Sequence, residues 1–144
     1  MSPINYATIV EKVKLLEDVV RKLSYIKNQG REKFFSDSIF QDAAIRNLAL
    51  GVEIIVDTGN HILAEAFHKP AKEYRDIIVQ LGASGVIPKE FSREHQSMAG
   101  FRHVLIHDYA DIDYELVYKH LERAPDNFSA FAKYYIAFLE KSTM

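Results

Sequence analysis

Three long stretches of the sequence carry apolar residues at spacings of three and four, and this periodicity limits the possible folds more than any other feature. They cover residues 6–27, 37–67 and about 111–141. Such spacings place side chains on one face of an α-helix, whereas a half-buried strand needs strict alternation. Six glycines and four prolines in 144 residues are also too few for an all-β protein with many turns. We therefore predict an all-α fold, a bundle of five to six helices in a single domain over residues 1–144.

The N-terminal half predicts two long helices. The helix over residues 6–27 should end at Gly30, with this glycine in the left-handed conformation. Its apolar face consists of Ile9, Val13, Leu16, Val20 and Leu23. The helix over residues 37–67 is apolar on more than one side, so it is either central or packed against a partner chain. Gly59 within it indicates close packing or a kink, because a mid-helix glycine costs about 1 kcal/mol relative to alanine.

Shorter helices are expected next. One covers about residues 73–81, and residues 82–85 form a loop. The following helix begins at Pro88, in the first turn where proline is tolerated, and continues to about Asp108.

The C-terminal part predicts two further helices. Asp111 or Asp113 caps the first, and Pro125 interrupts it. The second runs to about residue 141, and its aromatic residues are expected in the core: Phe128, Phe131, Tyr135 and Phe138.

Composition excludes several classes of function. The chain has no cysteine, which rules out disulfides, thiolate zinc sites and cysteine nucleophiles. Its net charge of −2 argues against a general binder of duplex DNA, so any nucleic acid must be held by a local cluster of cations. The N-terminus lacks the pattern of a signal peptide, and no apolar run reaches membrane-spanning length. We therefore expect a cytoplasmic protein that does not contact a membrane.

The segment from Met98 to Tyr109 contains the most informative group of residues. Arg102, His107 and Tyr109 bring a permanent cation, an imidazole and a phenol close together in sequence. On an ideal helix Arg102 and His107 point about 140° apart. Either the helix ends or bends near His107, or two copies of it face each other across a dimer.

These residue types suit cleavage of RNA by its own 2′-hydroxyl. An imidazole with a pKa near about 6.5 can accept the proton of the hydroxyl. A guanidinium can hold the phosphate and stabilise the charge that develops in the transition state. The nucleophile belongs to the substrate, so we expect no metal ion and no cofactor. His103 and His107 are four residues apart, but Val104 stands where a zinc protease would need glutamate.

The same residues carry a resemblance to a known family. Arg102-x4-His107-x-Tyr109 resembles the R-x4-H-x-Y motif of the HepT-like ribonuclease toxins of the HEPN class, with His103 in the supporting position after the arginine. The flanks agree with this family, and the resemblance covers essentially the whole chain: Met98-Ala99-Gly100-Phe101, Tyr74-Arg75-Asp76 and Gly85-Val86-Ile87-Pro88.

The resemblance implies a function and partners. It implies a homodimeric, metal-independent endoribonuclease, the toxin of a type VII toxin–antitoxin pair, which cleaves RNA, including tRNA. Arg102 and His107 become the catalytic residues, and His103 and Tyr109 support or bind the substrate. The implied partner is an MNT-type nucleotidyltransferase, which neutralises the toxin by adding AMP to Tyr109.

Two other functions are compatible with the same residues. In a non-catalytic subunit that binds a nucleotidyltransferase or a nucleotide, Arg102 would hold a nucleotide phosphate and RNA would stay intact. A structural dimerisation module would tolerate changes at Tyr109. Glu53, Asp57 and Asn60 follow one another at helical spacing, and we interpret them as a solvated stripe, with orientation of Arg102 or contact with a partner as the alternative.

Overall fold

The computed structural model describes residues 5–98 and 111–142. These residues form α1 (Tyr6–Asn28), α2 (Arg31–Ser36), α3 (Ser38–Phe67), α4 (Tyr74–Ala83), α5 (Lys89–His95) and α7 (Tyr114–Ser142). The described part of the chain contains no β-strand, and the prediction of an all-α bundle is confirmed. Within it, no helix combines the length and the apolarity needed to cross a membrane.

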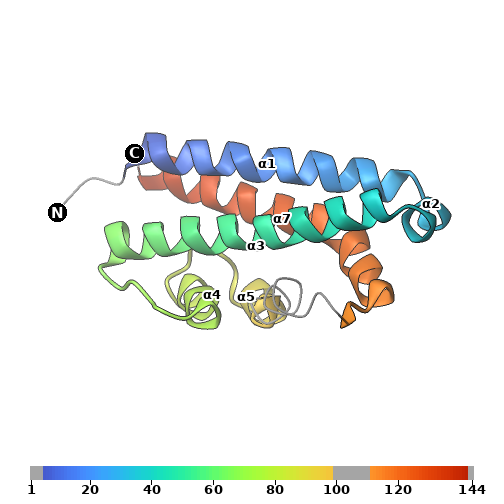
Figure 1. The fold of residues 1–144 in the computed structure, drawn as a ribbon. Coiled ribbons are helices and arrows are strands. Elements are labelled where there is room, and N and C mark those ends of the chain that lie inside the picture. The colour runs from blue at the N-terminus through green and yellow to red at the C-terminus, as the bar shows by residue number, and fades with distance from the viewer. Residues whose placement is uncertain (1–4, 99–110, 143–144) are drawn as a thin grey trace.

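The three long helices form the centre of the bundle. In Figure 1, α1, α3 and α7 lie side by side, and α4 and α5 cover α3 on its other side with their axes across it. The start of α1 and the end of α7 lie at the same end of the bundle. Each long helix contributes fully buried side chains to one core, among them Leu16 and Leu23 of α1, Ile55 and Ile62 of α3, and Phe131 and Tyr135 of α7.

The first helix follows its sequence pattern closely. Asn5 caps it, because its side-chain oxygen accepts a hydrogen bond from the backbone N–H of Thr8 at 3.2 Å. The predicted apolar face is correct except at its fourth position, where Val19 is buried and Val20 is only partly buried. The expected glycine cap is wrong. Gly30 has φ 94° and ψ 162°, which is not the left-handed helical conformation, and it precedes α2 rather than capping α1.

The short helix α2 was not predicted. It has six residues, too few for periodicity to reveal, and Phe34 anchors it in the core with 1% of its surface exposed. Asp37 ends α2 in an extended conformation and caps α3 through a 2.9 Å hydrogen bond from the N–H of Ile39. The predicted start of α3 at about residue 37 therefore agrees with its capping residue.

Glycines in α3 allow close approach of neighbouring helices. A Cβ on Gly59 would lie 2.6 Å from Cδ1 of Leu81 and 2.7 Å from the hydroxyl oxygen of Tyr135. The prediction of close packing at Gly59 is confirmed. The Tyr135 hydroxyl donates a 2.7 Å hydrogen bond to the carbonyl of Ile55, and complete burial raises the pKa of this phenol.

Two expectations for α4 and α5 are corrected. Gly82 and Ala83 belong to α4 rather than to a loop, because Gly82 packs directly against Ser92 of α5. Pro88 precedes α5 as its capping residue, and this helix ends at His95, so the single helix to about Asp108 is wrong. A turn at residues 96–97 follows it, and residues 99–108 lie outside the described residues.

Pro125 does not interrupt the last helix. The helix α7 is continuous from Tyr114 to Ser142, and Pro125 lies inside it. Proline removes one helical hydrogen bond and its ring crowds the preceding turn, which bends a helix without ending it when packing holds both halves. Figure 1 shows the N-terminal part of α7 (orange) turned away from the axis of the rest. Asp113 is the cap, since its side chain accepts hydrogen bonds from the N–H groups of the second and third helical residues.

Candidate functional site

The predicted catalytic motif lies between two described elements. Arg102, His103, His107 and Tyr109 all fall within residues 99–110, outside the described residues. Arg102 follows Met98 by four residues and His107 precedes Asp111 by four. The described residues next to the motif in the sequence are therefore Met98 and those at the start of α7.

A cavity lies beside Met98 and the N-terminal half of α7. It has a volume of about 310 Å³ and is enclosed by α3, the end of α5 and the N-terminal half of α7. Its floor is apolar and consists of Leu48, Val52, Ala124 and Phe128. Met98 lines it, and its polar residues are Glu94, His95, Ser97, His120, Arg123 and Asn127. A small concave site with an apolar floor and a few convergent polar groups is typical of ligand-binding pockets.

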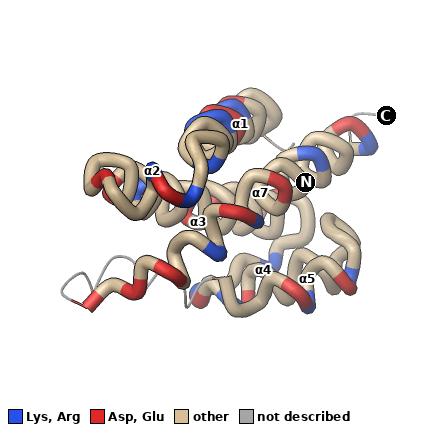
Figure 2. The backbone as a smooth tube through the Cα atoms, turned by 90° about the vertical axis from the view of Figure 1, so that its right-hand side faces the viewer, with Lys and Arg blue, Asp and Glu red and all other residues tan. Residues whose placement is uncertain are grey.

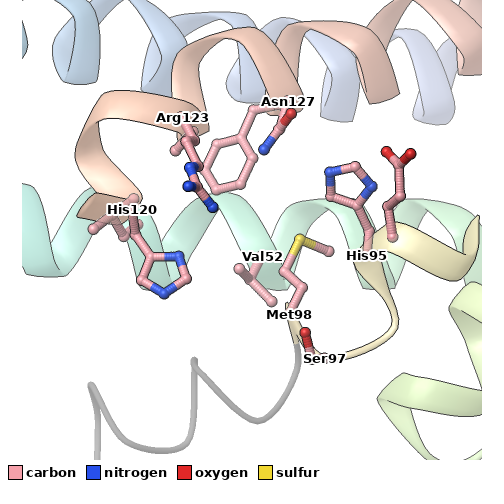
Figure 3. Close-up of a pocket in the computed structure, with 11 residues that line it drawn as sticks. Val52, His95, Ser97, Met98, His120, Arg123 and Asn127 are labelled. Atoms are coloured by element: carbon pink, nitrogen blue, oxygen red, sulfur yellow. The ribbon is translucent and has the colours of Figure 1, made fainter. Parts of the chain in front are cut away.

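One face of α7 supplies three of the polar groups. His120, Arg123 and Asn127 follow one another at spacings of three and four, so their side chains leave the helix on the same side. Figure 3 shows all three side chains bordering the cavity.

Contacts at the bend hold this part of α7 in place. Lys27 of α1 donates a 2.9 Å hydrogen bond to the carbonyl of Glu122. Arg31 of α2 forms an ion pair with Glu115, and its guanidinium lies 5.4 Å from the ring centroid of Tyr118. These contacts fix the N-terminal half of α7 against the other helices at its own angle.

Arg123 and His120 on this face of α7 differ in charge state. Arg123 is exposed, and no acidic side chain of the described residues lies within salt-bridge distance of its guanidinium. Partial burial lowers the pKa of His120, and repulsion by Arg123 lowers it further. The imidazole is therefore mainly neutral at pH 7. An anion bound between these two side chains would interact favourably with the guanidinium and with the protonated imidazole.

His95 faces the same cavity from α5 (Figure 3). Its Nδ1 lies 2.8 Å from the carbonyl oxygen of Phe91, and because a carbonyl only accepts, Nδ1 carries the proton. The ring lies against Phe91 in a tilted arrangement at a centroid distance of 4.1 Å and also contacts Phe131 in a T-shaped arrangement. Ser92 anchors the helix beneath it through a 2.7 Å hydrogen bond to the carbonyl of Ile78. His95 is thus held in one orientation, with Nε2 available to a ligand.

The polar residues of α3 have structural roles. The Tyr74 hydroxyl donates to the carboxylate of Glu53 at 2.9 Å, and the backbone N–H of Ala71 donates to Asn60 at 2.9 Å. Asp57 forms an ion pair with Lys12 of α1 at 2.5 Å. The interpretation as a solvated stripe holds for Asp57, whose side chain is 60% exposed, but not for Glu53 and Asn60, which are partly buried and tie α3 to α4 and the loop before it.

Sequence reasoning did not identify the residues of the cavity. His95, His120, Arg123 and Asn127 were not considered, although the last three have helical spacing. That spacing is common on solvated helix faces, and the cavity arises only because α5 ends opposite the bend in α7. Within residues 5–98 and 111–142, no group of three or more His, Asp or Glu side chains is arranged to hold a metal ion.

The chain resembles known proteins over most of its length. The family model described as Ribonuclease HepT-like matches residues 9–135. A relative from Shewanella oneidensis, described as mRNA nuclease HepT, is 24% identical over 123 residues, covering 85% of this chain and 92% of the relative.

Solved structures have the same fold. One contains the tri-AMPylated Shewanella oneidensis HEPN toxin in complex with its MNT antitoxin, with a TM-score of 0.80 at 23% identity over 95% of this chain and 99% of that one. Another is a cytosolic protein of unknown function, YutE from Bacillus subtilis, with a TM-score of 0.81 at 22% identity over 98% of this chain and 94% of that one.

Proposed function

The chain belongs to the ribonuclease HepT-like family, and from this premise we propose that it is a single-domain endoribonuclease, the toxin of a toxin–antitoxin pair, which cleaves RNA without a metal ion. The observation that carries the proposal is the complete Arg102-x4-His107-x-Tyr109 motif inside the matched range of residues 9–135. The relative described as an mRNA nuclease supports RNA as the substrate class.

The proposed reaction is an internal transesterification. His107 accepts the proton of a ribose 2′-hydroxyl, whose oxygen then forms a bond to the adjacent phosphorus. The bond from phosphorus to the 5′-oxygen of the next nucleotide breaks, and a second imidazole or a water protonates that oxygen. Arg102 binds the phosphate and stabilises the additional negative charge of the transition state. The products are a 2′,3′-cyclic phosphate and a 5′-hydroxyl.

We propose that the active site forms in a homodimer. One copy of the motif on an ideal helix does not direct Arg102 and His107 at one atom, since they point about 140° apart. Two copies facing each other would place two guanidinium groups and two imidazoles in one crevice. The second imidazole of the reaction would then come from the other copy of the chain.

The proposed partner is an MNT-type nucleotidyltransferase that adds AMP to Tyr109. Support comes from the similar Shewanella oneidensis toxin, which is described as tri-AMPylated and in complex with an MNT antitoxin. Adenylate on Tyr109, seven residues after Arg102, would introduce negative charge close to the motif and occupy space that RNA needs. Both effects oppose substrate binding.

An RNA cleavage assay in EDTA tests the nuclease. Purified wild-type chain should cleave total RNA, and the products should carry 2′,3′-cyclic phosphate and 5′-hydroxyl ends. Arg102→Ala and His107→Ala should each lose cleavage and still be folded. Arg93→Ala is the matched control, because this arginine of α5 is 71% exposed and does not line the cavity.

Two results would contradict the mechanism. Normal cleavage by either motif variant would remove Arg102 or His107 from it, and cleavage of an oligonucleotide with 2′-deoxyribose at the cut site would exclude the 2′-hydroxyl as nucleophile. Intact RNA after incubation with wild-type chain would instead favour the non-catalytic, nucleotide-binding subunit.

A further inference from the structure

We infer that the cavity between α3, α5 and α7 is a nucleotide subsite, which binds one nucleotide of single-stranded RNA next to the cleaved linkage. The inference rests on the proposed function only in naming RNA as the source of the nucleotide. The described residues that line the cavity lie on α3, α5 and α7 and at positions 97 and 98. The binding groups that we infer are thus additional to Arg102 and His107.

The Arg123 guanidinium, assisted by His120 when a bound phosphate favours its protonated form, defines where the phosphate binds. Arg123 and His120 border the cavity from one face of α7, and the guanidinium is not engaged by an acidic side chain of the described residues (Figure 3). A guanidinium fork matches the geometry of two phosphate oxygens. Glu94 lines the cavity from α5 and disfavours a phosphate close to that helix. The charges thus direct a phosphate to the α7 side.

The remaining walls suit a base. The apolar floor offers a surface for a planar ring, and the volume of about 310 Å³ is at the small end of ligand sites. Asn127 provides an amide that both donates and accepts, and Nε2 of His95 is directed away from the bond that Nδ1 makes to Phe91. Such groups can read the edge of an unpaired base, as in single-stranded RNA recognition, whereas a paired base in a duplex does not enter a cavity of this size.

Position along the chain links the cavity to the proposed chemistry. Met98 lines the cavity, and Arg102 follows it by four residues in the sequence. Successive phosphates of a single strand lie several ångströms apart, so a strand with one nucleotide in the cavity can present a nearby linkage to Arg102.

A binding assay without cleavage tests the subsite. The probes are fluorescein-labelled decamers of adenylate and uridylate with 2′-O-methyl ribose, which bind but cannot be cut through the 2′-hydroxyl. Fluorescence anisotropy at several salt concentrations gives affinity and salt slope. Arg123→Gln should weaken binding about tenfold, as expected for loss of one charged hydrogen-bonding group. Its slope of log affinity against log salt should fall by about 0.7, the value for one phosphate contact on a single strand.

Lys119→Gln is the matched control. Lys119 precedes His120 on α7, is exposed and does not line the cavity, so this variant removes the same charge without touching the site. It should bind the decamers within about twofold of wild type and retain the salt slope. Arg123→Lys should bind the decamers more tightly than Arg123→Gln but less tightly than wild type, because an ammonium group lacks the forked geometry of a guanidinium. Equal affinity and equal slope for Arg123→Gln and Lys119→Gln would overturn the inference.

A second measurement uses the unmodified chain and does not depend on any variant folding. In NMR, the imidazole signals of His120 should titrate at higher pH when a decamer is bound, because a phosphate favours the protonated ring. Among the described residues, Arg123 on α7 and Glu94 and His95 on α5 are the other charged or titratable groups lining the cavity, and they are present with and without the probe. An unchanged His120 titration at saturating decamer would overturn the inference.

Competition with free AMP distinguishes RNA from a free nucleotide as the ligand of the cavity. We expect AMP to compete with the decamers only at millimolar concentration, since it makes one set of contacts and the strand makes several. Competition by micromolar AMP would overturn the RNA assignment in favour of a free nucleotide. Failure of the wild-type chain to cleave RNA, with Arg123-dependent decamer binding intact, would refute the nuclease and leave the subsite standing.

Discussion

Substitution of Gly51 by alanine tests the packing that forms the floor of the cavity. Gly51 is buried in α3, and a Cβ there would lie 2.2 Å from Cε2 and 2.7 Å from Cδ2 of Phe128. Ordinary contact begins at 3.4 Å, so the ring has to withdraw by about 1.2 Å. Phe128 is only 4% exposed and its ring is enclosed by the core, which leaves little room for that movement.

Two opposing terms set the magnitude. Replacing a mid-helix glycine by alanine stabilises a helix by about 1 kcal/mol. Overpacking a core costs about 1–3 kcal/mol or more, and a contact this short belongs at the upper end. We expect Gly51→Ala to lower the free energy of unfolding by about 2 kcal/mol, which lowers the Tm by roughly 4–8 °C for a chain of this size.

Urea unfolding followed by circular dichroism measures the effect. Protein concentration must be held constant, because any dimerisation contributes to apparent stability. Ala137→Gly on the exposed side of α7 serves as calibration and should cost about 1 kcal/mol from helix propensity alone. Gly51→Ala combined with Phe128→Leu should be more stable than the sum of the single effects predicts, since the smaller side chain relieves the contact. A Gly51→Ala variant as stable as the wild type would refute the close approach of α3 and α7.

Two further predictions concern the modification of Tyr109 and the titration of His120. Co-expression with the cognate nucleotidyltransferase should add whole adenylate units to the intact mass, and Tyr109→Phe should abolish the addition at that position; an inactive complex of unmodified wild-type chain would contradict this. The depressed pKa of His120 means that the unfolded chain binds its proton first as pH falls through the ordinary value of 6.5. Stability should therefore decrease from pH 7 to pH 5, and His120→Asn should reduce the decrease; an equal loss in both proteins would contradict it.

The long helices were predictable because each buries a continuous face. The apolar faces of α1 and α3 repeat over many turns, and solvent-facing residues between them leave little ambiguity about the period. The predictions of secondary structure fail where tertiary contacts determine whether a helix forms or continues. The helix α2 exists because Phe34 fills a core position, and Pro125 is accommodated because contacts on both sides hold α7 together. Neither effect has a local signal in the sequence.

The site was predictable in one respect and not in another. The motif from Arg102 to Tyr109 is contiguous, so residue types alone predict a chemistry for it, and both this chemistry and its geometry stay predictions. The cavity joins α3, the end of α5 and α7, whose lining residues Val52, His95 and His120 are more than twenty positions apart in the sequence. Helical spacing places Arg123 and Asn127 on one face, but only the packed bundle shows that this face borders a cavity.

The charge distribution explains why such a cavity matters for a chain with a net charge of −2. Figure 2 shows basic and acidic residues interspersed over the described helices, an arrangement that gives little long-range attraction for a polyanion. Under the proposed function, affinity for RNA then has to come from short-range contacts at a few positions. A guanidinium at the rim of a cavity supplies one such contact, and the apolar floor adds stacking area that salt does not screen. Recognition of this kind selects strands with unpaired nucleotides over duplexes, because only an unpaired base can leave its neighbours and enter the cavity.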